Sequence, residues 1–185
     1  MAPNPEIVHP WDELVIAEGT EWETLVLDVR RVRKWCEPSG GPQPRPPALI
    51  VWHHTVGNAH AADPEAQLME LRRMADVDTF GLPYNFLVWP DPKPVIWYLN
   101  DVDGAWPHTL HHNSDAVAIS LHGNYERDEP SDASVAAMHS LTNALMSMWG
   151  AEINVVGHRD TSATACPGKH LYAALQALIA DTPDA

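Results

Sequence analysis

Cysteine is scarce in this sequence: Cys36 and Cys166 are its two cysteines among 185 residues. Two thiols are too few for a disulfide scaffold, although one bridge between them is compatible with the sequence. Long apolar runs are absent as well, since no window approaches the roughly 20 apolar residues that span a bilayer. The N-terminus has neither the basic start nor the apolar stretch of a signal peptide. We therefore expect neither membrane insertion nor a secretory signal.

Positive charge is also in short supply, because 11 Lys and Arg residues stand against 25 Asp and Glu residues, for a formal net charge of −14. Such a surface repels phosphate backbones, so we expect no nucleic-acid partner. Hydrophobic residues make up 45% of the chain, which at this length is enough to bury one sizeable core. The composition therefore predicts one main domain, which we expect to be a monomer.

The chain is interrupted once, by residues 37–47, which contain five prolines and two glycines and favour an extended connection. Before this proline-rich linker lies an N-terminal extension, residues 1–36, with one apolar run at 24–29 and a basic patch at 30–34. The extension is too short to be a secure domain, so we expect it to pack on the main body or on a partner. The main domain is predicted to cover residues 48–185.

After the linker, short apolar runs rich in β-branched and aromatic residues alternate with helical patterns. The predicted strands cover residues 48–52, 85–89, 95–99, 116–121 and 153–156. Helices are predicted over 63–77, with Asp63 as N-cap and Pro64 in the first turn, over 131–150, with Gly150 at the end, and over 169–180. This alternation predicts an α/β domain in which helices flank a mixed central β-sheet.

Two histidines and a cysteine follow predicted strands. His53 comes directly after one strand, and His158 and Cys166 follow the last one. Because sites in α/β sheets are built at strand ends, these side chains can converge. Neutral imidazole and thiolate are favoured zinc ligands, and three protein ligands with a fourth position open are typical of a catalytic site. The alternative is that each is an ordinary residue, since a lone histidine is more often exposed or hydrogen-bonded and a lone cysteine is usually buried.

Four segments carry a resemblance to a known family, and they occur in order: IVWHHT at 50–55, LPYNFLV at 82–88, HTLHHNSDAVAISLHGNY at 108–125 and VVGHRDTSATACPG at 155–168. From about residue 48 to 175, the chain resembles the zinc-dependent N-acetylmuramoyl-L-alanine amidases, which include phage lysozyme-like endolysins and animal peptidoglycan recognition proteins. The resemblance implies their fold, a bound zinc ion, and hydrolysis of the amide bond between N-acetylmuramic acid and L-alanine in bacterial peptidoglycan. The main domain would then be a zinc amidase catalytic domain.

The resemblance also implies roles for individual residues. His53, His158 and Cys166 would be the three zinc ligands. Tyr84 matches the family's catalytic tyrosine, which lies near the scissile carbonyl. Thr164, the second candidate catalytic residue, stands where some phage enzymes have lysine and active recognition proteins have threonine. A fixed positive charge is therefore not expected there, although the hydroxyl can still donate a hydrogen bond to an oxyanion.

Three further polar residues of the motifs have more than one interpretation. His54 is expected to be a hydrogen-bonding residue at the strand end, and orientation of a metal ligand is its alternative role. The resemblance places His108 and Asn113 near the substrate groove as candidate substrate contacts. His108 is also the reserve ligand if His53 does not coordinate the metal.

The eight tryptophans of the chain suggest flat apolar surfaces for sugar rings, but tryptophan in a strand is more often part of the core. Trp52 and Trp89 lie in predicted strands and are expected in the core. Trp106 lies in a predicted loop, which makes it the better candidate for a substrate contact.

The leading functional hypothesis is a phage endolysin that cleaves peptidoglycan. Without a signal peptide, such a lysin stays in the host bacterial cytoplasm until it is released to the cell wall. One alternative is a noncatalytic peptidoglycan-binding protein, but proteins of that kind lack the cysteine ligand. Another is a cytoplasmic amidase that recycles soluble muropeptides, whose relatives generally carry aspartate where this chain has Cys166. The motifs do not determine which stem peptide is preferred.

Overall fold

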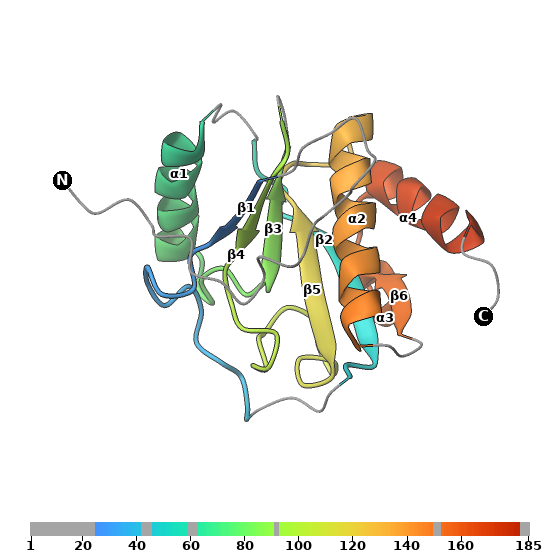
Figure 1. Ribbon diagram of the computed structural model, residues 1–185. Coiled ribbons are helices and arrows are strands. Elements are labelled where there is room, and N and C mark those ends of the chain that lie inside the picture. Colours follow the sequence, from blue (N-terminus) through green and yellow to red (C-terminus); the bar gives the residue numbers. More distant parts are fainter. Residues whose placement is uncertain (1–24, 42–45, 59–62, 91–92, 150–152, 182–185) are drawn as a thin grey trace.

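The computed structural model describes residues 25–41, 46–58, 63–90, 93–149 and 153–181, which form one sheet with helices on both sides (Figure 1). The strands are β1 (Leu25–Asp28), β2 (Leu49–His54), β3 (Phe86–Trp89), β4 (Val95–Tyr98), β5 (Ala116–Leu121) and β6 (Asn154–Gly157). The helices are α1 (Pro64–Val77), α2 (Asp132–Trp149), α3 (His158–Thr161) and α4 (Lys169–Asp181). The strand order is β1-β4-β3-β5-β2-β6, and β3 and β4 pair antiparallel while the other neighbours are parallel. The predicted mixed central sheet flanked by helices is confirmed.

Alternate residues of the central strands contribute to two apolar clusters, one on each face of the sheet. On one face, Leu71 and Ala75 of α1 pack with Leu87 and Trp89 of β3. On the other face, α2 and α4 cover a cluster that includes Trp52 of β2 (Figure 1). Every residue of β3, β4 and β5 is buried, which explains why these strands appear in the sequence as continuous apolar runs. The prediction that Trp52 and Trp89 belong to the core is confirmed.

The helices match their predicted positions closely. Asp63 caps α1 by accepting a hydrogen bond from the Ala66 N–H, and Pro64 lies in the first turn, as predicted. In α2, the apolar stripe includes the buried residue Met138, but Met148 at its far end is 42% exposed and lies outside the core. The predicted terminator of this helix, Gly150, is outside the described residues. The four-residue helix α3 was not predicted, because a single turn leaves no apolar periodicity.

The described part of the N-terminal extension packs on the main body. β1 pairs in parallel with β4 and forms one edge of the sheet. Val29 and Trp35 then join the apolar cluster under α1, so the core continues across the predicted boundary before residue 37. Cys36 is buried and free, and Cys166 is also free, so the disulfide that the sequence left open is not formed.

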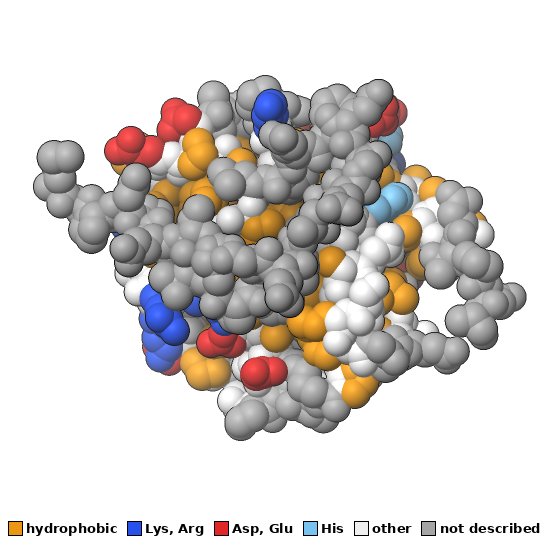
Figure 2. All heavy atoms as spheres, in the orientation of Figure 1, with side chains coloured by type: hydrophobic (Ala, Val, Ile, Leu, Met, Phe, Trp, Pro, Cys, Tyr) orange, Lys and Arg blue, Asp and Glu red, His pale blue; other side chains and the backbone are white. Residues whose placement is uncertain are grey.

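Charged side chains are dispersed over the visible described surface. Figure 2 shows Asp and Glu side chains at several separate places on this face, with Lys and Arg side chains between them. Within the described ranges, no helix is long and apolar enough to cross a membrane. The excess of acidic over basic residues therefore does not form a single acidic patch on the visible part of this face.

Candidate metal centre

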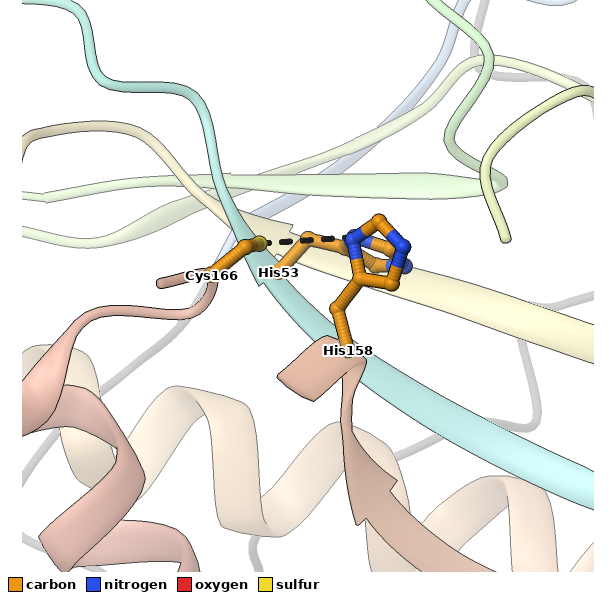
Figure 3. A group of neighbouring side chains, drawn as sticks. All are labelled: His53, His158 and Cys166. Carbon is orange, nitrogen blue, oxygen red and sulfur yellow. Dashed lines mark hydrogen bonds between the residues drawn. The ribbon is translucent and has the colours of Figure 1, made fainter. Parts of the chain in front are cut away.

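Three elements bring His53, His158 and Cys166 together (Figure 3). His53 lies in β2, which extends two residues further than predicted because β5 continues to pair with it as far as Leu121. β6 runs parallel to β2 on the other side and ends where α3 begins, so His158 follows directly at the same edge. The ring centroids of His53 and His158 are 4.6 Å apart. The loop after α3 then returns Cys166 to the two imidazoles.

The spacing of the three donor atoms fits a zinc ion. Sγ of Cys166 lies 3.6 Å from Nδ1 of His53. One donor atom from each of the three side chains lies within 4.8 Å of the other two. A tetrahedral zinc ion, with Zn–S about 2.3 Å and Zn–N about 2.05 Å, separates its sulfur and nitrogen ligands by about 3.6 Å. The distance between Cys166 and His53 therefore matches that of a zinc site, and the donor atom of His158 lies close to both.

Burial keeps both imidazoles neutral, which is the form that binds metal. Desolvation lowers the pKa of His53 well below its ordinary value, and the neighbouring histidines lower it further. Desolvation also lowers the pKa of His158. For Cys166, burial raises the pKa of the thiol to about 11, so the thiol releases a proton when it becomes a metal ligand. The site thus offers two neutral nitrogens and one thiol sulfur, and the thiol loses its proton when a metal ion binds.

The second nitrogen of His53 is held by a residue that the sequence did not single out. Oγ1 of Thr109, a buried side chain, lies 3.3 Å from Nε2 of His53 and 2.8 Å from Nδ1 of His108. If a metal occupies Nδ1 of His53, Nε2 carries the proton and donates to Thr109, whose own O–H donates to His108. In the sequence, the only indication of this role was that Thr109 directly follows His108 in the third motif. Thr109 therefore orients the His53 ring from behind.

The Cys166 loop is fixed by backbone contacts. The Cys166 N–H donates to Oγ1 of Thr164 (3.2 Å), and the Cys166 carbonyl accepts from the Arg159 N–H (2.8 Å). Two residues later, Gly168 has a φ of 90°. A Cβ on Gly168 would lie 2.3 Å from the carbonyl carbon of Tyr125, so only glycine fits there. These contacts explain the glycine of CPG, and they hold the loop so that Sγ of Cys166 lies beside β2.

His54, next to the first ligand, serves as a hydrogen-bonding residue at the strand end, as predicted. Successive side chains of a strand point to opposite faces, so the His54 ring turns away from its neighbour. Its Nδ1 accepts a hydrogen bond from the Tyr125 N–H at 3.1 Å. The His54 backbone N–H also points to Sγ of Cys166 at 3.4 Å, so the residue supports the cysteine through its main chain.

A pocket of about 770 Å³ opens over the three donors, within the range of small-molecule sites. Its lining includes the predicted residues Tyr84, Thr164 and His108 together with the donors. The rings of Tyr84 and His53 have centroids 5.3 Å apart. Desolvation raises the pKa of the Tyr84 phenol, so it keeps its proton at neutral pH.

Two of the candidate substrate contacts do not line this pocket in the part of the chain that the structure describes. Nε1 of Trp106 donates to the Asp101 carbonyl at 2.7 Å, within its own loop. Oδ1 of Asn113 accepts from the Thr109 N–H at 2.9 Å, so Asn113 supports the turn that carries Thr109. Their proposed contacts with substrate therefore need a substrate that extends beyond the pocket.

Comparisons with known proteins agree with this arrangement. Residues 43–169 match the N-acetylmuramoyl-L-alanine amidase family. A peptidoglycan-recognition protein of Drosophila melanogaster is 31% identical over 148 residues, which cover 74% of this chain and 79% of that protein. The endolysin amidase LysCS from Clostridium intestinale has a TM-score of 0.61 at 20% identity, covering 86% of this chain and 97% of the other. Drosophila PGRP-LB has a TM-score of 0.68 at 21% identity, covering 87% and 95%. These two solved structures share the fold of this chain.

Proposed function

The chain belongs to the N-acetylmuramoyl-L-alanine amidase family, and we propose that it is a zinc-dependent hydrolase. Its substrate would be the amide bond between the lactyl group of N-acetylmuramic acid and L-alanine in bacterial peptidoglycan. The observation that carries this proposal is the convergence of His53, His158 and Cys166 at the floor of the pocket. Within the described ranges, no other group of His, Cys, Asp and Glu is spaced to hold a metal ion.

The donor set suits catalysis better than structural support. Two neutral imidazoles and one thiolate leave a net charge of about +1 on a zinc site and a fourth position open to the pocket. When bound there, zinc supplies a Lewis acid that polarises a carbonyl and lowers the pKa of water from 15.7 to about 7. The pocket in front of the donors has room for the substrate on that side.

The proposed catalytic residues of the chain act as hydrogen-bond donors. Tyr84 is protonated at neutral pH, so its phenol is suited to donate to the oxyanion that develops on the scissile carbonyl, rather than to take up a proton. Thr164 uses its oxygen to accept from the Cys166 N–H, which leaves its O–H free to point toward the pocket. We assign both residues to stabilisation of negative charge in the transition state.

The biological setting of this activity is part of the proposal. A phage endolysin that waits in the host cytoplasm and is then released to the cell wall fits the likeness to LysCS. The likeness to the Drosophila peptidoglycan-recognition protein supports a second candidate, a protein that binds peptidoglycan without cleaving it. Cys166 favours the enzyme over this candidate, because a binding protein has no need of a third metal donor in its pocket.

The test is the release of new L-alanine amino groups from purified peptidoglycan. We expect release that stops when a zinc chelator is added and returns with added zinc. The matched variant Cys166→Ser should keep the fold but lose at least 100-fold in activity, because a hydroxyl is a poor zinc ligand at neutral pH. Binding to peptidoglycan with no release from walls of either the diaminopimelate or the lysine type, despite bound zinc, would support the binding protein instead.

A further inference from the structure

The loop that follows β2, residues 55–58, forms part of the pocket wall in a strained conformation. Val56 has a φ of 61°, in the left-handed region that β-branched residues rarely adopt. Its side chain is 60% exposed and lines the pocket, so it is not held by core packing. Strain of this kind persists only where neighbouring contacts impose it, and it is concentrated at functional sites.

The hydroxyl of Thr55 is the centre of those contacts. Its oxygen accepts hydrogen bonds from the Gly57 N–H and from the Gly123 N–H, both at 3.2 Å. A hydroxyl oxygen has two lone pairs and one proton, so these two bonds use its acceptor capacity. The remaining O–H must therefore donate to Nδ1 of His122, which lies 2.8 Å away.

His122 is consequently neutral in this arrangement and connects both ends of the loop. Because Nδ1 accepts from Thr55, the ring proton is on Nε2, which donates to the Asn58 carbonyl at 3.2 Å. The ring is buried and stacks on Trp89, with centroids 4.1 Å apart. Gly57 packs directly against it, since a Cβ there would lie 2.6 Å from Cε1 of His122.

We propose that His122 is a positioning residue that holds loop 55–58 as a wall of the pocket and thereby sets how tightly a muramyl peptide binds. The proposal rests on the amidase function proposed above and assigns to His122 no part in the chemical step. Other lining of the same pocket comes from α1, including the ion pair between Glu70 and Arg73. An apolar side chain at Val56 and this charged pair together suit a peptide that carries both apolar and ionised groups.

The test compares His122→Phe with Thr55→Val. Phenylalanine keeps the stacking on Trp89 and loses both hydrogen bonds, while valine removes the hydroxyl at nearly constant shape. In each variant we expect KM to rise about tenfold with kcat and zinc content unchanged, because the loop loses two hydrogen bonds in His122→Phe and three in Thr55→Val. The double variant should raise KM by less than the product of the two single effects, since both variants remove the bond between Thr55 and His122.

Hydrogen exchange gives a readout that does not depend on hydrolysis. The amides of Gly57 and Gly123 donate to the Thr55 hydroxyl, which Thr55→Val removes and which His122→Phe leaves without the ring nitrogen that orients it, so their exchange should be about tenfold faster in both variants. His122→Asn keeps an acceptor near the position of Nδ1, so its KM should lie between that of the wild type and that of His122→Phe. His112→Phe is the matched control, because His112 pairs with Asp115 away from the pocket, and it should change neither quantity.

The outcomes separate this inference from the proposed function. A wild-type protein that hydrolyses peptidoglycan, with unchanged KM and unchanged exchange in His122→Phe, would overturn the inference and leave the amidase intact. A fall in kcat or in zinc content would also overturn it, because His122 would then act on the metal site. If the wild type proves inactive, the same variants should still weaken calorimetric binding of a muramyl tripeptide about tenfold, and equal binding would refute the inference.

Discussion

At the scale of single residues, the position of His53 depends on contacts at both of its ring nitrogens. Nδ1 faces Cys166, while Nε2 faces the hydroxyl of Thr109. Burial makes the ring neutral and the Thr109 contact selects which nitrogen is free for a metal. A histidine in a strand thus becomes a ligand with one defined orientation, through a threonine that lies 56 residues away in sequence.

Thr109→Val tests this dependence. Valine has nearly the same shape but cannot accept a hydrogen bond from the Nε2–H of His53. We therefore expect zinc affinity to fall by 10- to 100-fold while the protein stays folded. Competition with a chromophoric chelator measures the affinity, and circular dichroism checks the fold. Thr79→Val, at an exposed threonine, is the control. Equal zinc affinity in Thr109→Val and wild type would show that the contact does not orient the ligand.

At the scale of elements, the site is assembled where two neighbouring parallel strands end. β2 and β6 are in register at Trp52 and Gly157, so the residues that follow both positions meet at one edge. β2 then passes into loop 55–58, and β6 passes into α3. Each exit is also held by a side-chain contact: Thr55 binds His122, and Asp160 accepts from the Gly157 N–H at 2.8 Å.

Val56→Gly tests whether the strained exit of β2 serves binding. Glycine adopts positive φ without penalty, which removes about 1–2 kcal/mol of strain, but it adds about 0.5–1 kcal/mol of chain entropy on unfolding. We expect a small net gain in stability, up to about 1.5 kcal/mol, with KM raised several-fold because the apolar side chain on the pocket wall is lost. Urea denaturation and steady-state kinetics measure the two effects. A stabilised variant with unchanged KM would show that Val56 does not contact substrate.

At the scale of the whole molecule, the sheet order explains where the pocket opens. The chain leaves β2 through α1 on one face and enters β3, passing over β5. It leaves β5 through α2 on the opposite face and enters β6, passing over β2. Crossovers that diverge from adjacent strands leave a crevice at the carboxyl ends of those strands, where ligands bind in α/β sheets.

We expect the metal-free protein to lose stability as the pH falls below about 6.5. Burial lowers the pKa of His53, His54 and His158 and lowers that of His108 to about 3. Since the folded pKa lies below the unfolded value of about 6.5, the unfolded chain binds more protons in this range, and stability present above it is lost on acidification. His108 alone accounts for about 2 kcal/mol between pH 7 and pH 5.

Urea denaturation at the two pH values measures this loss. His108→Gln cannot take up the proton, so its stability should fall by about 2 kcal/mol less than that of wild type over the same interval. Carboxylates take up protons in both proteins, so the difference between the two slopes of unfolding free energy against pH reports His108 alone. Parallel slopes for the two proteins would show that His108 is not held neutral by the fold.

Sequence alone was enough for most of the elements and for the candidate donors. Apolar runs and helix caps depend on local chemistry, so the central strands and the start of α1 at Pro64 were predictable within about two residues. The resemblance named His53, His158 and Cys166 as ligands, and these are the side chains that the fold brings together.

Contacts between distant segments were decided only by the tertiary structure. That β1 joins the sheet beside β4, that Thr109 lies behind His53, and that His122 holds loop 55–58 all depend on segments far apart in the chain. Trp106 and Asn113 hydrogen-bond within their own turns, which neither the predicted loop around Trp106 nor the motif that contains Asn113 indicated. Sequence determines which chemical groups are present and which local structure each segment prefers. Which histidine nitrogen contacts which hydroxyl is decided by how distant segments pack together, because packing sets the distances between them.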